Sequence, residues 1–364
     1  MFSIIHKKFG VALLATALLV MQSCNKEFED IPTVTKPVPS NTIGDVIETD
    51  ASFSILKVAA TKAGLMPVLK NPDNKLTFFA VDDAAIAASG LSLAAINAMP
   101  AAQLNAILSF NIIPQALPSS SITALFPPLQ MPTLLALDPT NPLVKMNIFI
   151  SKRGTALYAN NIPVKQADIA AGNGVIHKVA ALVAPPSKLL SSLIYDDPQL
   201  SLFEAAILRG DVGSSGLTSI DFLLKYPVVN FTVFAPTNDA MKVVINQLSG
   251  GAVPLAAPDQ VFIDFINNFV PVQTAQGIVA YHILGTRAFA ANLPEAATYI
   301  PTLVNLAVPS HPGVQVQSSF TGPFATGLKV TGVGNGGVAS NVIVLDKNAV
   351  NGVLHIIDRV LLPQ

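Results

Sequence analysis

Few side chains in this sequence could bind a ligand or act on one. The chain has 364 residues but only five histidines and one cysteine. Tyr281 and His282 are adjacent, and on a strand adjacent side chains point to opposite faces, so one would be buried and the other free to bind. Thr237, Asn238 and Asp239 place three oxygen-bearing side chains in a row. These five residues are the candidate binding residues, and no catalytic residue is predicted.

Two further histidines belong to a motif that occurs twice. Its asparagine, glycine and histidine stand in the same order as Asn173, Gly174 and His177 and as Asn351, Gly352 and His355. Each histidine shares strand parity with neighbouring valines, which predicts a buried, hydrogen-bonded structural role. Because the two histidines fall in different copies, we expect no metal site between them, and no cofactor is predicted.

The glycine-rich stretch Gly332–Gly337 fits the dinucleotide pattern G-x-G-x-x-G. A phosphate-binding loop must open a helix, whereas the run that follows, Val338–Leu345, reads as a strand. The stretch is therefore predicted to be a hairpin turn. We find no P-loop, zinc-protease helix motif, nucleophile elbow or calcium loop, so the sequence favours a protein that is not an enzyme.

Arg209-Gly210-Asp211 spells a tripeptide that integrins recognise. A structural explanation is sufficient, because Arg209 ends an amphipathic pattern and Gly210 suits the left-handed position that terminates a helix. We therefore do not predict integrin binding.

Composition narrows the range of partners. Only 12% of residues are charged and the formal net charge is -1, whereas about 25% charged residues is ordinary. The chain lacks the basic surplus that phosphate backbones require, so nucleic acid is not an expected partner. A single cysteine excludes a disulfide framework.

Four sequence blocks recur in the same order, which predicts two copies of one folding unit. The pairs are Asp50–Leu56 with Asp197–Phe203, Leu76–Asp83 with Phe231–Asn238, Ser109–Ile113 with Ala280–Leu284, and Asn173–His177 with Asn351–His355. At this length each copy can bury its own core.

The blocks predict particular elements. The first has apolar residues three and four apart, Phe53, Leu56 and Ala60 in one copy and Leu200, Phe203, Ala206 and Ile207 in the other, which indicates a packed amphipathic helix. The second is a short strand, Phe231–Phe234, that turns into a helix near Ala240. The last is an Asn-Gly turn with positive φ followed by an alternating strand.

These motifs resemble fasciclin domains. The resemblance lies in Thr232–Ala240, the central Tyr281-His282, and Asn351–His355 followed by a terminal Leu-Leu-Pro. The first copy departs from it, with Val81 for the proline, Asp82-Asp83 for Thr-Asn, and Phe110-Asn111 for Tyr-His. Over about residues 41–364 the resemblance implies two α+β domains, each a β-sandwich or wedge with helices along one edge. It also implies adhesion or ligand binding without known catalysis.

The N-terminus predicts export. Lys7 and Lys8 precede the apolar run Phe9–Met21, which is too short to span a bilayer and typical of a signal peptide. The residues before Cys24 resemble the lipobox of bacterial lipoproteins in part, since Ser23 fits and Gln22 is unusual. The resemblance implies cleavage before Cys24 and its acylation, for example with palmitate.

The expected organisation is a signal peptide (1–23), an acylated tether (24–41), a divergent first domain (42–186) and a second domain (187–364). Only Val183–Ser187 remains as linker, so we expect the domains to touch. Asn25 resembles the sorting signal of outer-membrane lipoproteins, and the acidic cluster Glu27–Asp30 resembles surface-export signals.

The sequence thus predicts an outer-membrane lipoprotein of a Gram-negative bacterium, with exposure on the cell surface left open. Expected partners are a polysaccharide, a matrix polymer or an envelope protein. The alternative is an accessory scaffold subunit of an outer-membrane assembly. A stripe of apolar residues, Phe262, Phe265, Ile266 and Phe269, is either core or a contact surface for such a partner.

Overall fold

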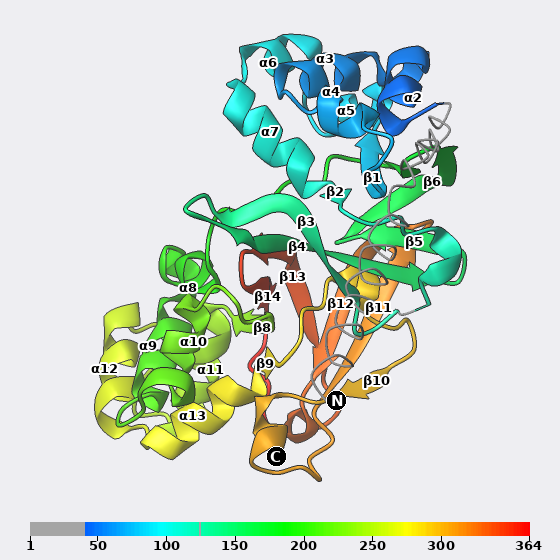
Figure 1. The fold of residues 1–364 in the computed structure, drawn as a ribbon. Coiled ribbons are helices and arrows are strands. Elements are labelled where there is room, and N and C mark those ends of the chain that lie inside the picture. The colour runs from blue at the N-terminus through cyan, green and yellow to red at the C-terminus, as the bar shows by residue number, and fades with distance from the viewer. Residues whose placement is uncertain (1–40, 124) are drawn as a thin grey trace, which may run out of the picture. The chain divides into compact units, whose positions relative to one another are not determined.

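A computed structural model describes residues 41–123 and 125–364. The signal peptide, Cys24 and nearly all of the tether lie outside the described residues. The described residues belong to one compact unit that contains two seven-stranded sheets, each with its own set of helices (Figure 1). Among the described residues no helix is long and apolar enough to cross a membrane.

The first domain begins with helices and ends with strands. Its helices are α2 (Ile43–Thr49), α3 (Ser54–Lys62), α4 (Met66–Lys70), α5 (Asp83–Ala88), α6 (Leu93–Ala98) and α7 (Ala101–Phe110). Its strands are β1 (Leu76–Val81), β2 (Ile112–Ile113), β3 (Leu129–Asp138), β4 (Asn141–Arg153), β5 (Ala156–Ala159), β6 (Ile162–Ala171) and β7 (Gly174–Val179). The sheet order is β2-β1-β7-β6-β5-β4-β3.

The second domain repeats this plan. Its helices are α8 (Leu190–Tyr195), α9 (Ser201–Gly210), α10 (Ile220–Lys225), α11 (Asn238–Leu248), α12 (Asp259–Phe269) and α13 (Val272–Tyr281). Its strands are β8 (Phe231–Pro236), β9 (Ile283–Leu284), β10 (Thr298–Ile300), β11 (Val314–Thr321), β12 (Phe324–Thr331), β13 (Ser340–Ala349) and β14 (Gly352–Ile357). The sheet order is β10-β11-β12-β13-β14-β8-β9.

The two sheets correspond strand for strand. In each, the strand after the Asn-Gly motif pairs in parallel with the strand of the second sequence block, with Gly174 opposite Leu76 in one domain and Gly352 opposite Phe231 in the other. The predicted duplication and α+β class, with wedge-like sheets and helices, are confirmed.

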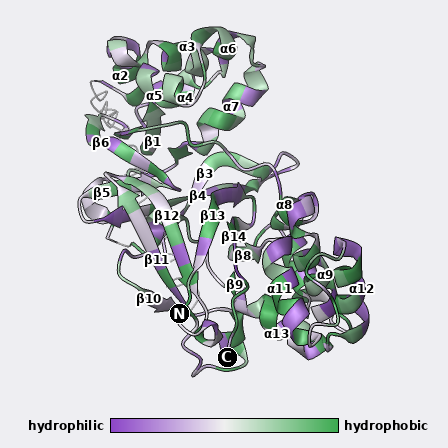
Figure 2. Cartoon of the chain, turned by 180° about the vertical axis from the view of Figure 1, so that it is seen from behind, coloured by the Kyte–Doolittle hydropathy of each residue, from purple (hydrophilic) through white to green (hydrophobic). Residues whose placement is uncertain are grey.

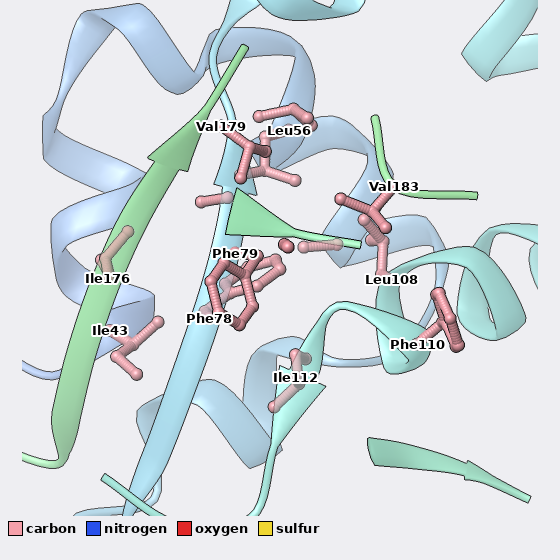
Figure 3. Packing of buried hydrophobic residues seen from close by; sticks show 14 of the residues in the cluster. Ile43, Leu56, Phe78, Phe79, Leu108, Phe110, Ile112, Ile176, Val179 and Val183 are labelled. Carbon is pink, nitrogen blue, oxygen red and sulfur yellow. The ribbon is translucent and has the colours of Figure 1, made fainter. Parts of the chain in front are cut away.

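The helix-forming blocks also fold as predicted. Phe53, Leu56 and Ala60 are buried, as are their counterparts in α9. Figure 3 shows the first core, where Phe78 and Phe79 of β1 lie among side chains from β7 and the surrounding helices. In Figure 2 the helices of the second domain alternate between hydrophobic and hydrophilic residues, as helices with one face in a core do.

The prediction for the last block is partly wrong. Gly174 has a φ of 155°, but Gly352 is not among the glycines with positive φ. Both positions need glycine for another reason. A Cβ at Gly174 would lie 1.9 Å from the Leu76 carbonyl oxygen, and a Cβ at Gly352 would lie 2.3 Å from the Phe231 carbonyl oxygen. The strand that follows does not alternate either, because β14 is buried along its whole length. It lies between two other strands with both faces covered, as parallel strands usually do.

The domains touch, as expected from the short linker. Phe149 of the first domain packs with Phe289 and Val353 of the second. The buried Asn292 amide donates to Ser151 Oγ over 2.6 Å. These contacts join β4 directly to the second domain.

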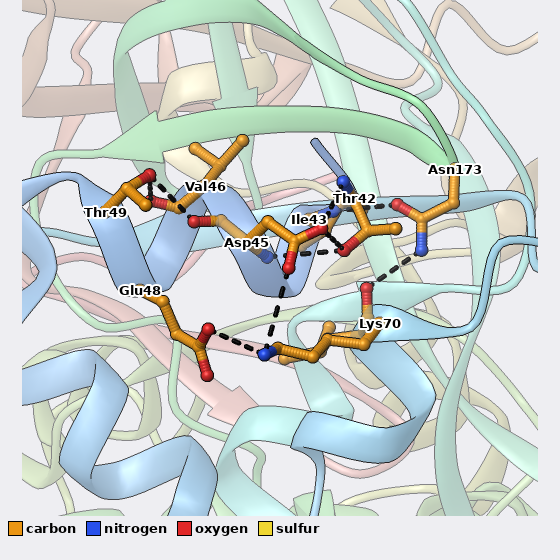
Figure 4. Close-up of polar contacts among 9 residues, drawn as sticks. Thr42, Ile43, Asp45, Val46, Glu48, Thr49, Lys70 and Asn173 are labelled. Atoms are coloured by element: carbon orange, nitrogen blue, oxygen red, sulfur yellow. Dashed lines mark hydrogen bonds and ion pairs between the residues drawn. The ribbon is translucent and has the colours of Figure 1, made fainter. Parts of the chain in front are cut away.

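A buried asparagine ties helices to the sheet in each domain. Asn173 Oδ1 accepts a hydrogen bond from the Ile43 backbone N–H at 2.8 Å (Figure 4). Its amide donates to the carbonyls of Leu69 and Asn71. Asn351 repeats the arrangement, accepting from Leu190 N–H at 2.8 Å and donating to two carbonyls at the end of α10. Each asparagine therefore satisfies three backbone groups that would otherwise lack a partner.

Replacing this asparagine should destabilise the protein strongly. Asn351→Ala leaves buried backbone groups unpaired, so we expect a loss of about 3 kcal/mol in the free energy of unfolding. Urea unfolding of the full chain measures this loss. Asn267→Ala, on the exposed face of α12, is the control and should change stability by less than about 0.5 kcal/mol. Equal effects of the two changes would contradict the structural role.

Candidate binding surface

Three of the predicted binding residues meet at a hollow on the second domain. Thr237, Asn238 and Asp239 line it at the start of α11, and its volume is about 540 Å³. Lys242, Asp259, Ile343 and Asp358 come to the same hollow from α11, α12, β13 and the segment after β14.

The chain reaches this hollow through the predicted strand-to-helix corner. β8 ends at Pro236, and Thr237 caps α11 by accepting a hydrogen bond from the Ala240 N–H. The helix begins at Asn238, two residues earlier than expected. Asp239 lies exposed in the first turn, where the helix dipole favours a negative charge.

The Asn238 side chain is used mainly for hydrogen bonds within the fold. It is buried, its Oδ1 accepts from the Leu202 N–H at 3.1 Å, and its amide donates to Pro198, Ser201 and Asp259. The side chain therefore fixes the start of α9 and the start of α12 at the floor of the hollow. Of the three predicted residues, only Asp239 has an exposed side chain for a ligand.

The hollow is acidic. The Lys242 ammonium lies 2.6 Å from Asp259 and its hydrogen bond lowers the pKa of that carboxyl. Burial alone would raise the pKa of Asp358, but hydrogen bonds from Asn341 and Ser340 hold it below its usual value. At neutral pH these two carboxylates are ionised and only one ammonium faces them. Such a surface suits hydroxyl groups or cations and disfavours anions.

The sequence did not reveal most of the residues that line the hollow with Asp239. Lys242 follows Asp239 by three positions on α11, which is one helical turn, so its place on the same face was recoverable from spacing. Asp259 and Asp358 come from separate segments, and no local signal could have placed them beside α11.

The first domain builds the same corner from different residues. Asp82 caps α5 and forms an ion pair with Lys165 at 2.8 Å. Asp83 accepts from the Ile55 N–H and from Ser54 Oγ, as Asn238 does from Leu202 N–H. At this corner the first domain thus keeps the hydrogen bond to the preceding helix block and differs in the ion pair at the surface.

The prediction for Tyr281 and His282 is wrong in its geometry. They stand at the end of helix α13 rather than on a strand, and both are completely buried. The Tyr281 hydroxyl donates to the Gly313 carbonyl and accepts from the Val333 N–H. His282 bonds the Ile278 carbonyl through Nδ1 and accepts from the Leu361 N–H through Nε2. Neither side chain can touch a ligand while the domain is folded.

His177 and His355 lie where the sequence predicted. Both are fully buried, and each bonds two backbone groups. In His177, Nε2 faces the Leu117 carbonyl and Nδ1 accepts from the Asp168 N–H. In His355, Nε2 faces the Ala288 carbonyl and Nδ1 accepts from the Asp346 N–H. Burial lowers the pKa of both imidazoles. Within residues 41–123 and 125–364, no group of three or more His, Cys, Asp and Glu side chains could hold a metal ion.

The remaining motifs are structural. Gly332–Gly337 connects strands β12 and β13 through a short turn, as predicted. Gly210 is the last residue of helix α9 and is not left-handed as expected. The position needs glycine for a different reason, since α13 approaches so closely that a Cβ would lie 2.8 Å from Gln276 N. Asp211 accepts three hydrogen bonds at the start of α10, and Arg209 donates to the Val270 carbonyl.

The buried His282 predicts a loss of stability in acid. Burial lowers its pKa from 6.5 to about 4, so between these values the unfolded chain binds a proton that the folded chain excludes. Its contribution is complete above pH 6.5 and falls as the pH drops toward 4. By pH 5 this amounts to about 2 kcal/mol. Urea unfolding at pH 7 and at pH 5 gives the stability lost on acidification for each protein. This loss should be smaller for His282→Asn than for wild type. An unchanged pH dependence would contradict this role.

The chain is similar to known proteins. The family model of the fasciclin domain matches residues 51–185 and 217–363. Over 151 residues, 41% of this chain, the sequence is 30% identical to transforming growth factor-beta-induced protein ig-h3 of Sus scrofa, of which the match covers 20%. The solved FAS1 domain pair of the insect cell adhesion molecule fasciclin I is similar, with a TM-score of 0.36 and 16% identity over 88% of this chain and 95% of that one. The chain belongs to the fasciclin domain family and carries two copies of its domain.

Proposed function

We propose that this protein is a lipid-anchored adhesion or ligand-binding protein of a Gram-negative outer membrane that performs no catalysis. Its tandem domains would engage a polysaccharide, a matrix polymer or a neighbouring envelope protein. The observation that carries this proposal is that polar side chains of the family motifs hydrogen-bond backbone groups inside each domain. The surfaces around α5 and α11, in contrast, carry different ion pairs in the two domains.

The hollow beside α11 supports binding over reaction chemistry. Its carboxylates face an ammonium and amides, which can hold hydroxyl groups by hydrogen bonds. The histidines described above that could serve as general bases are buried and bonded to the backbone. A polymer could cross this open hollow without entering the core.

The proposed anchor rests on Cys24 and the segment before it. An apolar run with a basic N-terminal flank leads to the single cysteine of the chain, at the place where lipoproteins are acylated. Two or more acyl chains would hold the protein durably at a membrane, since each buried methylene contributes about 0.8 kcal/mol.

A second candidate function is that of a scaffold subunit in an outer-membrane assembly. The apolar stripe on α12 serves partly as core, because Phe262 and Ile266 are buried. The rest of it is available as a contact surface, because Phe269 is 72% exposed and stacks on Phe265. An exposed aromatic pair of this kind suits a protein partner. Copurification of one stoichiometric partner, lost in Phe269→Ala, would favour this alternative.

The hollow can be tested by one conservative change. Asp239→Asn removes an exposed charge that makes no structural ion pair, and we expect about tenfold weaker retention of the full chain on insoluble envelope polysaccharide, or ~1.4 kcal/mol. Asp264→Asn on the exposed face of α12 is the matched control and should bind as wild type does. Equal binding by the two variants would remove the hollow from the proposal.

The anchor can be tested separately. Cells grown with a labelled fatty acid should incorporate label into the wild-type chain and not into Cys24→Ala, whereas Ser23→Ala, which keeps a small residue before the cysteine, should still be labelled. The Cys24→Ala chain should also leave the membrane fraction. An unlabelled wild-type chain would contradict lipid anchoring.

A further inference from the structure

A crevice of about 160 Å³ lies between the two domains. One wall is the β3–β4 hairpin, with Gln130, Lys145 and Asn147, and the other is the loop between α10 and β8, with Pro227 and Asn230. The Asn230 amide donates to Gln130 Oε1 at 3.3 Å and links the walls. The crevice shares no residue with the hollow beside α11, so it is a separate place for a ligand.

The chemistry of the lining is amide-rich and basic. Gln130, Asn147 and Asn230 supply amide donors and acceptors, and Lys145 is the ionisable side chain that lines the crevice. The Lys145 ammonium donates to the Leu134 carbonyl at 3.3 Å. It forms no ion pair with any described carboxylate, and no carboxylate lines the crevice.

A buried cation lies directly behind this lining. The Arg287 guanidinium is 4.4 Å from the centre of the Phe149 ring and donates to the Val350 carbonyl, and both Phe149 and Val350 line the crevice. Burial lowers the pKa of Arg287 to about 9, so it is still charged at neutral pH. No ion pair joins it to a carboxylate of the described chain, and its Nε lacks a hydrogen-bond partner. An uncompensated charge in a poorly polarisable interior attracts an anion in the adjoining crevice.

Size and surroundings favour a sugar over a peptide. The crevice has the volume of about five water molecules, which suits one ring and not a folded segment. The amides of the lining can bond neighbouring hydroxyls of such a ring.

We propose that this crevice binds a carboxylate-bearing sugar unit of an acidic polysaccharide. Lys145, supported by the charge of Arg287 behind the wall, would face the carboxylate. The amides of Gln130, Asn147 and Asn230 would bond the hydroxyls. Both domains contribute to the site, so it exists only while they stay docked through Phe149 and its neighbours.

The test is binding of the full chain to polygalacturonate, with neutral dextran and poly-L-glutamate as comparisons, by calorimetry at low salt. We expect polygalacturonate to bind and the other two to bind at least about tenfold more weakly. Lys145→Gln removes the facing charge and Asn230→Asp introduces a repelling one, so each should weaken polygalacturonate at least about tenfold. Lys329 is an exposed lysine on β12 that does not line the crevice, so Lys329→Gln should bind as wild type does.

Several results would overturn the proposal. These are absence of polygalacturonate binding, equal affinity for dextran, equal affinity for poly-L-glutamate, which would indicate an acidic peptide site, or wild-type affinity in both crevice variants. Unfolding curves that match wild type show that a loss of binding is not a loss of fold. Asp239→Asn should leave polygalacturonate binding unchanged, so this proposal and the proposal for the hollow can fail independently.

Discussion

Everything in each domain is organised around a buried asparagine that precedes a central parallel strand. Its side chain bonds one backbone N–H and two carbonyls at the ends of neighbouring helices, and the glycine after it lets the adjacent strand approach within a distance that no Cβ would permit. Because unpaired buried backbone groups are costly, this small motif fixes how the helices meet the sheet. The same hydrogen bonds recur around Asn351.

This constraint explains which substitutions the two domains tolerate. Where the second domain has Asn238, the first has Asp83, and both accept the N–H at the start of the next helix block. Where the second has His282, the first has Asn111, whose amide bonds the carbonyl four residues earlier and the closing segment at Val183. In these two pairs the side chain differs but bonds corresponding backbone positions. The domains therefore share a fold and differ at the surface, which is where a binding function would diverge.

Most of the fold could be predicted from the sequence because its determinants are local and repeated. Helical spacing in Phe53–Ala60 led to the correct buried face, and the apolar neighbours of His177 and His355 led to the correct burial of both histidines. Tyr281 and His282 were misplaced because the strand after them, β9, has only two residues, too few for a period to show. The hollow and the crevice depend on tertiary structure, which brings Asp358 and Asp239 to one hollow and Gln130 into contact with Asn230. No pattern within one segment indicates those contacts.

In the proposed function the protein presents a binding surface and leaves what it binds chemically unchanged. The most direct test is to incubate the full chain with a polysaccharide that it retains and then to compare the recovered polymer with the starting polymer by mass and by NMR. If the protein binds without catalysis, retention is saturable and the recovered polymer has unchanged length and composition. A polymer that is shortened or chemically altered in proportion to the amount of protein would contradict it.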